Sequence, residues 1–390
     1  MGRVAVVPFR QITIWGLGLM GGSLAAALKA RGYGGKITGI SSTSSVSRAT
    51  EAGFVDDGYP HDEYEAGVAN ADLVILASPI NTILCNLEKL GPVLQPGTVV
   101  TDVGSTKAAI VQHARAVLGD EVTFIGGHPM AGSESQGITA ADAYLYENAV
   151  WVLTPDSKGA SGGSGLKEAP RERTGNGDQS DALSRLMALA EFVGAKVVVT
   201  DPVRHDRIAA RISHLPQTLA IALMNLAGDW HEEDDLTLRL AAGGFRDLTR
   251  IASSPFEMWS DIYNTNRDGV LEAVDDMIER LQELRADVAG DRLSDLFERA
   301  NRLRLNVPHD TKGFLRPLQD VMVVVQDEPG VLSRIAGTLS THSINIRDIE
   351  VLKVRVGEGG TMRLAFDSLK EAEAAVGLLA QEGFQAWVRE

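Results

Sequence analysis

The chain has 390 residues, more than one compact core usually holds, and we expect two or three domains. Hydrophobic residues make up 44% of the chain and charged residues 23%, values that exclude a disordered, collagen-like or coiled-coil protein. Lys and Arg number 37 against 52 Asp and Glu, and the resulting net charge of −15 repels phosphate backbones and anionic lipid surfaces. We therefore expect neither a nucleic-acid partner nor a membrane partner.

The chain has one cysteine, and it lies in an apolar run. Cys85 cannot form an internal disulfide or a cysteine-rich zinc site, and the run predicts a buried, inert thiol. The apolar stretch within residues 1–10 is too short for the hydrophobic region of a signal peptide, so we expect a cytoplasmic protein. Residues 11–28 lack charge, as a membrane helix does, but their glycines favour a strand, a turn and a helix instead.

Residues 10–201 alternate short apolar runs with helical patterns, which is typical of βαβ units. We expect strands at 12–15, 36–40, 73–77, 99–103, 123–126 and 150–153, with helices such as 23–31 and 107–118. Residues 157–181 are dominated by glycine, serine and charge and predict a flexible insertion. A helix at 182–193 and a strand at 196–199 complete an α/β Rossmann-type dinucleotide-binding domain with a doubly wound parallel sheet.

Residues 202–306 carry helical patterns at 208–226, 236–240 and 270–288, and they predict an all-α domain. Pro216 should kink the first of these helices. The long apolar segments are difficult to cover within a single helical layer, so we expect this domain to form a homodimer.

Residues 317–390 predict a small α+β domain of the ferredoxin-like type. The expected order is strand 321–326, helix 331–340, strand 344–356, strand 361–366, helix 369–381 and strand 384–388. Ser368 and Glu371 form a capping box at the start of the second helix.

A glycine motif, G-x-G-x-x-G, stands between the first predicted strand and its helix, at Gly16, Gly18 and Gly21. In this context the glycines allow a tight turn, close approach of a pyrophosphate and helix packing, so the motif predicts dinucleotide binding. The acid that usually contacts the ribose of NAD is replaced by Ser41, Ser42 and Thr43. Small hydroxyls leave room for the extra phosphate of NADP, but the same residues also suit a plain polar loop, and NAD and NADP both stay open.

Two polar motifs follow neighbouring predicted strands, where the carboxyl ends of strands border the ligand crevice. Ser105 lies in GSTK and His128 in GHPMAG, so we expect both to face the cofactor. A histidine is suited to accept a hydroxyl proton while hydride leaves the same carbon, because its pKa lies near working pH. The alternative is a histidine that only satisfies a turn.

Further polar groups open the helical domain. Ser213, His214 and Gln217 occupy neighbouring turns of an otherwise apolar helix, which is costly unless they are paired or face a site. His205 and Asp206 resemble metal ligands only loosely, and we expect no metal. Arg246 or Arg250, beside a glycine turn, could clamp an anionic substrate or pair with a structural acid such as Asp247.

Five motifs in order resemble the prephenate and arogenate dehydrogenases, the TyrA family of tyrosine biosynthesis, over nearly the whole chain: GLGLMGGS at 16–23, DVGSTK at 102–107, GGHPMAGSE at 126–134, the DP-x-x-HD and SHLP runs at 201–216, and GGFRDLTRIA at 243–252. The resemblance implies oxidative decarboxylation of prephenate to 4-hydroxyphenylpyruvate, or of arogenate to tyrosine. It implies cofactor contacts at Gly16, Gly18, Leu19, Met20, Gly21, Ser41, Ser78 and Pro79.

The same resemblance implies roles for the polar residues. His128 would polarise or deprotonate the substrate hydroxyl, Ser105 would hydrogen-bond it, and Arg250 would hold a carboxylate. Ser213 and His214 would shape the pocket with Gln217, a position where many relatives have histidine. An amide carries no charge, so the choice between prephenate and arogenate stays open. The insertion at 157–181 departs from the usual compact connection, and we expect it to have no catalytic role.

The C-terminal unit looks like an ACT domain, a small module that senses amino acids and often binds its effector where two copies meet. The resemblance implies a tyrosine effector at Asp327, Pro329, Gly330, Val331, Asn345 and Ile346. Two other functions share parts of this pattern. A β-hydroxyacid dehydrogenase has a similar glycine motif followed by helices, and a non-catalytic amino-acid-binding regulator would keep the dinucleotide fold without turnover.

Overall fold

The computed structural model describes residues 7–131, 135–155, 179–290, 293–305, 318–326, 328–355 and 359–389. The chain divides into two compact units, Met1–Ala289 and Gly290–Glu390, and each is described by itself. Most of the predicted insertion at 157–181 lies outside the described residues, and its residues 179–181 begin a helix.

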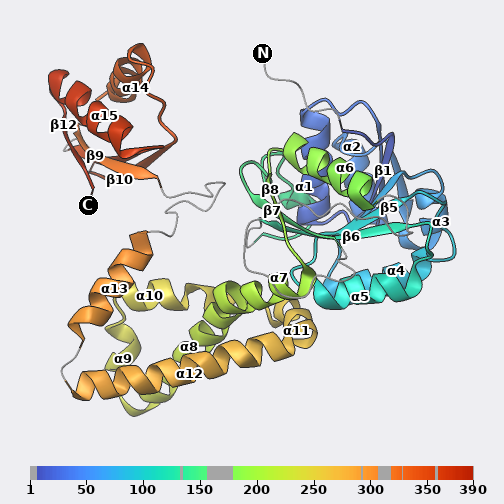
Figure 1. The fold of residues 1–390 in the computed structure, drawn as a ribbon, viewed down its shortest axis with the longest axis horizontal. Helices are drawn as coiled ribbons and strands as arrows, with labels where there is room; N and C mark the ends of the chain where they lie inside the picture. The colour runs from blue at the N-terminus through green and yellow to red at the C-terminus, as the bar shows by residue number, and fades with distance from the viewer. Residues whose placement is uncertain are drawn as a thin grey trace. The chain divides into compact units, whose positions relative to one another are not determined.

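The first unit is built on an eight-stranded sheet in the order β3-β2-β1-β4-β5-β6-β7-β8 (Figure 1). The strands are β1 (Gln11–Trp15), β2 (Lys36–Ser41), β3 (Asp57–Pro60), β4 (Leu73–Leu76), β5 (Val99–Asp102), β6 (Thr123–Met130), β7 (Val150–Thr154) and β8 (Lys196–Val199). The strand order reverses between β1 and β4, and in such sheets ligands bind outside the carboxyl ends at that point. The predicted Rossmann-type fold is confirmed.

The sheet differs from the prediction in two places. The segment DGYP has no apolar run, so the sequence predicts no strand there, yet it forms β3 at the sheet edge beside β2. The strand expected to end at Gly126 continues to Met130, because it leaves β5 after Ile125 and then pairs antiparallel with β7. As a result His128 lies within a strand, and β7 and β8 run opposite to the other strands.

Helices cover both faces of this sheet (Figure 1). One face packs against α1 and α6, with Ile14, Leu24 and Leu186 in one core, and the other packs against α4 and α5, with Leu76 and Ile83 in a second core. Full burial of such a side chain contributes about 1.5–3 kcal/mol. The helices of this part are α1 (Leu19–Ala30), α2 (Thr43–Glu51), α3 (Tyr64–Val68), α4 (Ile80–Leu90), α5 (Ala108–Val117) and α6 (Gln179–Phe192), with short 3₁₀ turns η1 (His61–Glu63) and η2 (Ile138–Ala140).

The expectation of a buried cysteine is wrong, since Cys85 is exposed. The buried face of α4 is formed by Ile80, Ile83, Leu87 and Leu90, which recur at helical spacing. Cys85 falls between these positions, so the apolar run around it does not cover its thiol.

The chain then becomes helical, as predicted. The elements are α7 (Pro202–Ala209), η3 (Ala210–His214), α8 (Leu215–Glu233), α9 (Leu236–Arg239), α10 (Gly243–Thr249), η4 (Arg250–Ser253), α11 (Phe256–Thr265) and α12 (Arg267–Ala289). η3 is a π-helical turn that directly precedes the helix carrying Pro216. Proline cannot donate a backbone hydrogen bond, so the expected irregularity near Pro216 takes this form.

The second unit holds α13 (Ser294–Leu305) and the C-terminal domain. Its antiparallel sheet has the order β10-β11-β9-β12, formed by β9 (Gln319–Val325), β10 (Asp348–Arg355), β11 (Gly359–Phe366) and β12 (Gln385–Val388). Helices α14 (Val331–Thr341) and α15 (Leu369–Gln381) pack on it, with Val323, Ile335 and Leu379 in the core. Ser368 Oγ accepts from Glu371 N at 3.3 Å, as the capping box predicts.

Within the described part of the chain, no helix is long and apolar enough to cross a membrane.

Candidate active site

The glycine turn joins β1 to α1 at the point where the strand order reverses. Gly16 has φ +113°, and a Cβ there would collide with the carbonyl oxygen of Ala77 at the end of β4. A Cβ on Gly21 would collide with the carbonyl oxygen of Gly16. Beside Gly18 the space is open. The first and third glycines are therefore required by the fold, whereas the second leaves room for a ligand.

The N-terminus of α1 fits a dinucleotide pyrophosphate. The helix begins at Leu19 after Gly18, which gives it no side-chain cap, and its first turn carries no acidic residue. The backbone N–H groups there are available to an anion, and the helix dipole favours one. Leu19 and Met20 pack against the core, and Met20 O accepts from Tyr146 Oη at 2.7 Å. The first turn of α1 is thus fixed by core packing and by the hydrogen bond from Tyr146.

The remaining predicted cofactor residues lie at the ends of the adjacent strands. Ser41 ends β2 and is buried, and its Oγ accepts from Leu17 N at 3.3 Å. Ser78 Oγ donates to Trp15 O at 3.3 Å, and Pro79 is the N-cap of α4. All of them therefore surround the glycine turn, and they suit a dinucleotide lying across β1 and β4. Ser42 instead caps α2, accepting from Ser45 N.

A chain of hydrogen bonds runs from His128 into the helical domain. His128 Nδ1 lies 2.9 Å from His205 Nε2, and His205 Nδ1 lies 2.7 Å from Asp206 Oδ1. Asp206 also accepts from the backbone N–H groups of Lys107 (2.7 Å) and Ala108 (2.8 Å). β6 supplies the first histidine and α7 supplies the other two groups, so the relay forms only when the two domains pack together.

The relay determines the tautomer of His128. A carboxylate only accepts, so His205 Nδ1 donates to Asp206, and when this ring carries a single proton its Nε2 is an acceptor. His128 Nδ1 must donate to it, which leaves the lone pair of His128 Nε2 available. Burial, with nearby His205, Lys107 and His214, holds the pKa of His128 well below the ordinary 6.5. His128 is therefore a neutral base near neutral pH.

His214 lies close to the relay. It is buried, and its Nδ1 lies 3.3 Å from Asn266 Nδ2, which donates to Asp206 O at 2.8 Å. Burial lowers the pKa of His214 to about 4. The ring also makes an edge contact with Trp259. Ser105 is half-buried in the turn between β5 and α5.

Among the remaining predicted substrate residues, Gln217 contacts the segment that begins at Arg250. Gln217 is 1% exposed on α8, and its Nε2 donates to Ile251 O at 3.0 Å. This bond ties α8 to η4, the turn that begins at Arg250. Arg250 is exposed, and Ser213 is half-buried in η3. The contacts place Gln217 and the Arg250 segment together, but they do not bring the Arg250 guanidinium to His128.

The predicted effector residues do not gather at one place within a single copy. Gly330, with φ +92°, is the N-cap of α14, and Val331 is its first, buried residue. Asn345 and Ile346 follow the other end of this helix, whose 11 residues span about 16 Å at 1.5 Å per residue. Pro329 is exposed beside Gly330, and Asp327 lies outside the described residues. A shared site would need a second copy of the domain.

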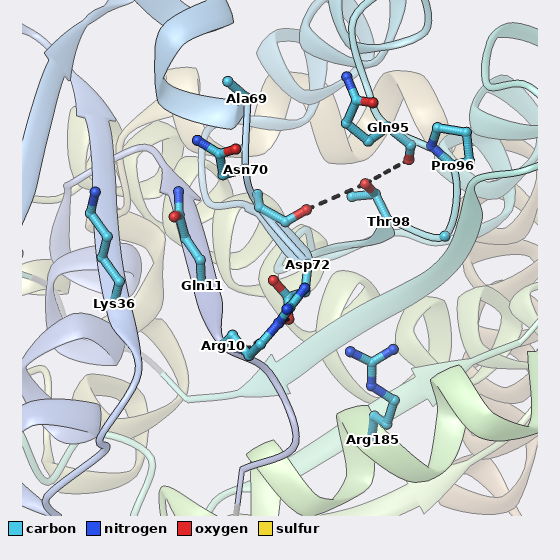
Figure 2. A pocket seen from close by; sticks show the side chains of 12 residues that line it. Arg10, Gln11, Lys36, Ala69, Asn70, Asp72, Gln95, Pro96, Thr98 and Arg185 are labelled. Atoms are coloured by element: carbon cyan, nitrogen blue, oxygen red, sulfur yellow. Dashed lines mark hydrogen bonds and ion pairs between the residues drawn. The ribbon is translucent and has the colours of Figure 1, made fainter.

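Two other features are not part of the site. Among the described residues no group of His, Cys, Asp and Glu could hold a metal ion. A hollow lined by Arg10, Lys36, Asp72 and Thr98 lies at the amino ends of β1, β2, β4 and β5 (Figure 2). Arg10 pairs there with Asp72 at 3.3 Å. This hollow is at the edge of the sheet opposite the glycine turn, so it is not the catalytic crevice.

Sequence reasoning missed the roles of several residues. It treated His205 and Asp206 as weak metal ligands, whereas they support His128, and it did not consider Asn266 or Trp259. The signal for the first two was their position directly after β8, where α7 begins. No local signal marked Asn266, because its partners are 52 and 60 residues away.

Comparison with known proteins identifies the family. The model "Prephenate dehydrogenase, nucleotide-binding domain" matches residues 24–168, "Prephenate dehydrogenase, dimerization domain" matches 201–301, and "AHAS small subunit-like ACT domain" matches 321–381. The prephenate dehydrogenase of Bacillus subtilis is 35% identical over 373 residues, which cover 94% of this chain and 95% of that protein.

Two solved structures agree. Prephenate dehydrogenase from A. aeolicus, in complex with hydroxyphenyl propionate and NAD+, has a TM-score of 0.65 and 31% identity, covering 76% of this chain and 96% of that one. Synechocystis arogenate dehydrogenase has a TM-score of 0.63 and 32% identity, covering 75% and 98%. The chain belongs to the prephenate dehydrogenase family.

Proposed function

We propose that this chain is an NAD(P)-dependent prephenate dehydrogenase that converts prephenate to 4-hydroxyphenylpyruvate in tyrosine biosynthesis. Its domains are a nucleotide-binding domain at 10–201, a helical substrate and dimerisation domain at 202–306 and an ACT domain at 317–390. The observation that carries the proposal is the relay from Asp206 through His205 to His128, which leaves a neutral imidazole at the edge of the sheet that holds the glycine turn.

The chemistry follows from the substrate. Prephenate is a cyclohexadiene with a ring hydroxyl, a ring carboxylate and a pyruvyl side chain. His128 Nε2 accepts the hydroxyl proton as the carbonyl forms. A nicotinamide dinucleotide held at the glycine turn would supply the acceptor for the hydride from the same carbon. The ring carboxylate leaves as carbon dioxide, and its bonding electrons complete the aromatic ring. The phenolate oxygen then takes the proton back from His128, which restores the neutral base. A base with a lowered pKa suits this step because it is unprotonated before the substrate arrives.

The other polar residues hold the substrate. Ser105, at the carboxyl end of β5, hydrogen-bonds the hydroxyl, and Arg250 binds a carboxylate through its planar guanidinium. Ser213 and His214 line the pocket. The pKa of His214 is lowered to about 4, so it binds as a neutral ring. Cofactor contacts come from the glycine turn together with Ser41, Ser78 and Pro79.

One observation favours arogenate as a second candidate substrate. Gln217 Nε2 donates to a backbone carbonyl, so the orientation of the amide is set. Its Oε1 is buried, and among the described residues it has no hydrogen-bond partner. A buried oxygen of this kind favours a ligand that donates, and arogenate carries an ammonium group where prephenate has a keto group. The arogenate dehydrogenase of Synechocystis shows that relatives act on this substrate.

We also propose a homodimer formed by the helical domain. Ile208 and Ile212 are 43% and 65% exposed on α7 and η3, while His205 and His214 on the same segments are buried. On α12, Leu271, Ile278 and Leu281 are each about half exposed. A second copy would remove this apolar surface from water. Size-exclusion chromatography with light scattering tests this, and a monomer at micromolar concentration would contradict it.

We further propose that the protein is cytoplasmic and that tyrosine inhibits it. The single cysteine suits a reducing compartment, and the C-terminal domain matches an ACT-type model. Deleting the residues after Arg316 should abolish inhibition by tyrosine while turnover persists. Inhibition retained by the truncated protein would instead indicate competition at the active site.

The experiment that tests the activity follows reduced-nicotinamide absorbance with prephenate and with arogenate, each supplied with NAD and with NADP. Turnover with at least one pair is expected, and the ratio of the four values defines substrate and cofactor preference. Absence of turnover with all four pairs, in a protein that still binds a nicotinamide cofactor, would contradict the proposal. A β-hydroxyacid dehydrogenase or a non-catalytic regulator would then be favoured.

A further inference from the structure

The most completely buried charged group in the first unit is one that the proposed chemistry does not use. Lys107 and Asp102 are both 0% exposed, and they form an ion pair between the end of β5 and the start of α5. Burial lowers the pKa of Lys107 and raises that of Asp102, so water exclusion is costly for both charges. A pair of this kind needs further hydrogen bonds to compensate the loss of water.

Two of those hydrogen bonds go to Gly127, the residue before His128. Lys107 Nζ donates to Gly127 O at 2.8 Å, and Gly127 N donates to Asp102 Oδ1 at 3.1 Å. The second oxygen, Asp102 Oδ2, accepts from Gly104 N at 2.8 Å. Both backbone polar groups of Gly127 are therefore held by the two side chains of one ion pair.

The ion pair supplies to Gly127 the hydrogen bonds that a neighbouring strand supplies elsewhere in the sheet. β6 leaves β5 after Ile125, so Gly127 no longer has a backbone partner on that side. A Cβ on Gly127 would lie 2.5 Å from the backbone oxygen of Asp102, and one on Gly126 would lie 2.4 Å from Thr154 Oγ1. Both distances are shorter than real Cβ contacts, so glycine at 126 and 127 allows β6 to pass close to the ends of β5 and β7 just before His128.

The same short segment also holds the imidazole of His128. The backbone N–H groups of Lys107 and Ala108 donate to Asp206, which orients His205, and His205 accepts from His128. The turn that follows β5 thus contacts His128 by two routes. One runs through the Gly127 peptide and sets the backbone, and the other runs through the relay and sets the ring.

We propose that the Lys107–Asp102 ion pair is a positioning device for His128, which aims the catalytic imidazole and keeps it neutral. Only the catalytic role of His128 in this inference rests on the proposed function. The orientation of His128 follows from geometry, because both side chains of the pair hydrogen-bond the backbone of Gly127, the residue before it. The neutrality follows from burial and charge, because His128 is desolvated and His205, Lys107 and His214 lie close enough to disfavour its protonation; the Lys107 cation opposes a second positive charge.

The test is Lys107→Met, which keeps the length of the buried stem and removes the cation and its hydrogen bonds. Lys36→Met is the matched control, because Lys36 forms an ion pair with Asp57 in the same domain at an exposed site. We expect kcat of Lys107→Met to fall by ~100-fold, the scale of a misplaced catalytic group, while the dissociation constant of the cofactor changes by less than about threefold. Lys36→Met should match the parent in both.

A readout without turnover separates this inference from the proposed function. In protein labelled with ¹³C-histidine, the His128 resonance is the one that disappears in His128→Asn. Lys107→Met should raise its titration midpoint toward 6.5 and broaden or shift the neutral-form signal, whether or not the parent oxidises prephenate. An unchanged midpoint and an unchanged kcat would overturn the proposal, and parent turnover would still stand.

If the single variant does not fold, the double variant Asp102→Asn/Lys107→Met tests the proposal instead. It removes both charges, so no unpaired charge stays buried. A folded double variant that binds cofactor, yet shows the same loss of kcat and the same displaced His128 titration, supports the device. A double variant with parental kcat and titration overturns it. Loss of cofactor binding in proportion to kcat would mean a purely structural pair and also overturns it.

Discussion

His205 Nε2 lies 2.9 Å from His128 Nδ1, and the opposite nitrogen of the same ring lies 2.7 Å from Asp206. The imidazole of His205 therefore separates His128, the base that we propose, from the carboxylate of Asp206. Because the relay runs from a strand of the dinucleotide domain to a helix of the next domain, the protonation of His128 depends on the packing between them.

Asp206→Asn tests the direction of the relay. An amide can donate to His205 Nδ1, which turns the His205 ring into a donor at Nε2 and forces His128 to carry its proton on the wrong nitrogen. We expect kcat to fall by roughly 10²–10⁴-fold with a small change in substrate KM, as for other relays with a reversed tautomer. Asp201→Asn is the control, since Asn also caps a helix. Equal activity in the two variants would show that the relay is not used.

The stability of the protein should fall as pH decreases below 6.5. The pKa values of His128 and His214 lie below 6.5 in the folded protein, the latter at about 4, and return to 6.5 on unfolding. The unfolded chain thus binds more protons between these values, so protonation favours unfolding there. Urea titrations at pH 7.5, 6.5 and 5.5 should show a decreasing midpoint, and His214→Gln should flatten the decrease. A midpoint that rises toward pH 5.5 would be inconsistent with neutral buried rings.

Gln217→His should change substrate choice. The replacement removes an oxygen that only accepts and introduces a ring that donates, so binding of an ammonium group loses its partner while a keto acid does not. We expect the ratio of kcat/KM for arogenate to that for prephenate to fall by roughly 5–100-fold, the range for one unmet buried hydrogen bond. A ratio that stays within twofold would remove Gln217 from substrate recognition.

Gly18→Ala should separate cofactor binding from folding. Its φ is −87° and no atom lies within 4 Å of an added Cβ, so the fold should tolerate alanine. The methyl group would occupy the space we assign to the pyrophosphate, and the cofactor dissociation constant should rise at least about tenfold at an unchanged Tm. Gly119→Ala, also in open space, should change neither quantity. Tight cofactor binding by Gly18→Ala would place the pyrophosphate elsewhere.

Local patterns predicted the parts of this protein that depend on local physics. The glycine turn, the capping box at Ser368 and the full extent of α15 are confirmed, because each follows from residues within one or two turns. The shift of β6 from β5 to β7 was not predicted, since it involves hydrogen bonds from Gly127 to the buried Lys107–Asp102 pair, 20 and 25 residues earlier in the chain.

The positions of Ser105 and His128 in the sheet could be predicted from the sequence, but the contacts of His128 could not. Ser105 and His128 were placed at the correct edge of the sheet, because the carboxyl ends of neighbouring strands must meet there. The role of His205 was not visible, because a histidine beside an aspartate has the same local sequence whether it binds metal, caps a helix or supports a base. Only the approach of α7 to β6 distinguishes these.

The most direct test of the central claim compares His128→Asn with the parent and with His113→Asn, in which a half-buried histidine of α5 that pairs with Glu88 is changed in the same way. The measurement is single-turnover formation of reduced nicotinamide at saturating cofactor and substrate. Loss of a general base predicts a rate at least ~10²-fold lower in His128→Asn, with cofactor binding intact and His113→Asn equal to the parent. A His128→Asn protein that turns over at the parental rate would contradict the account.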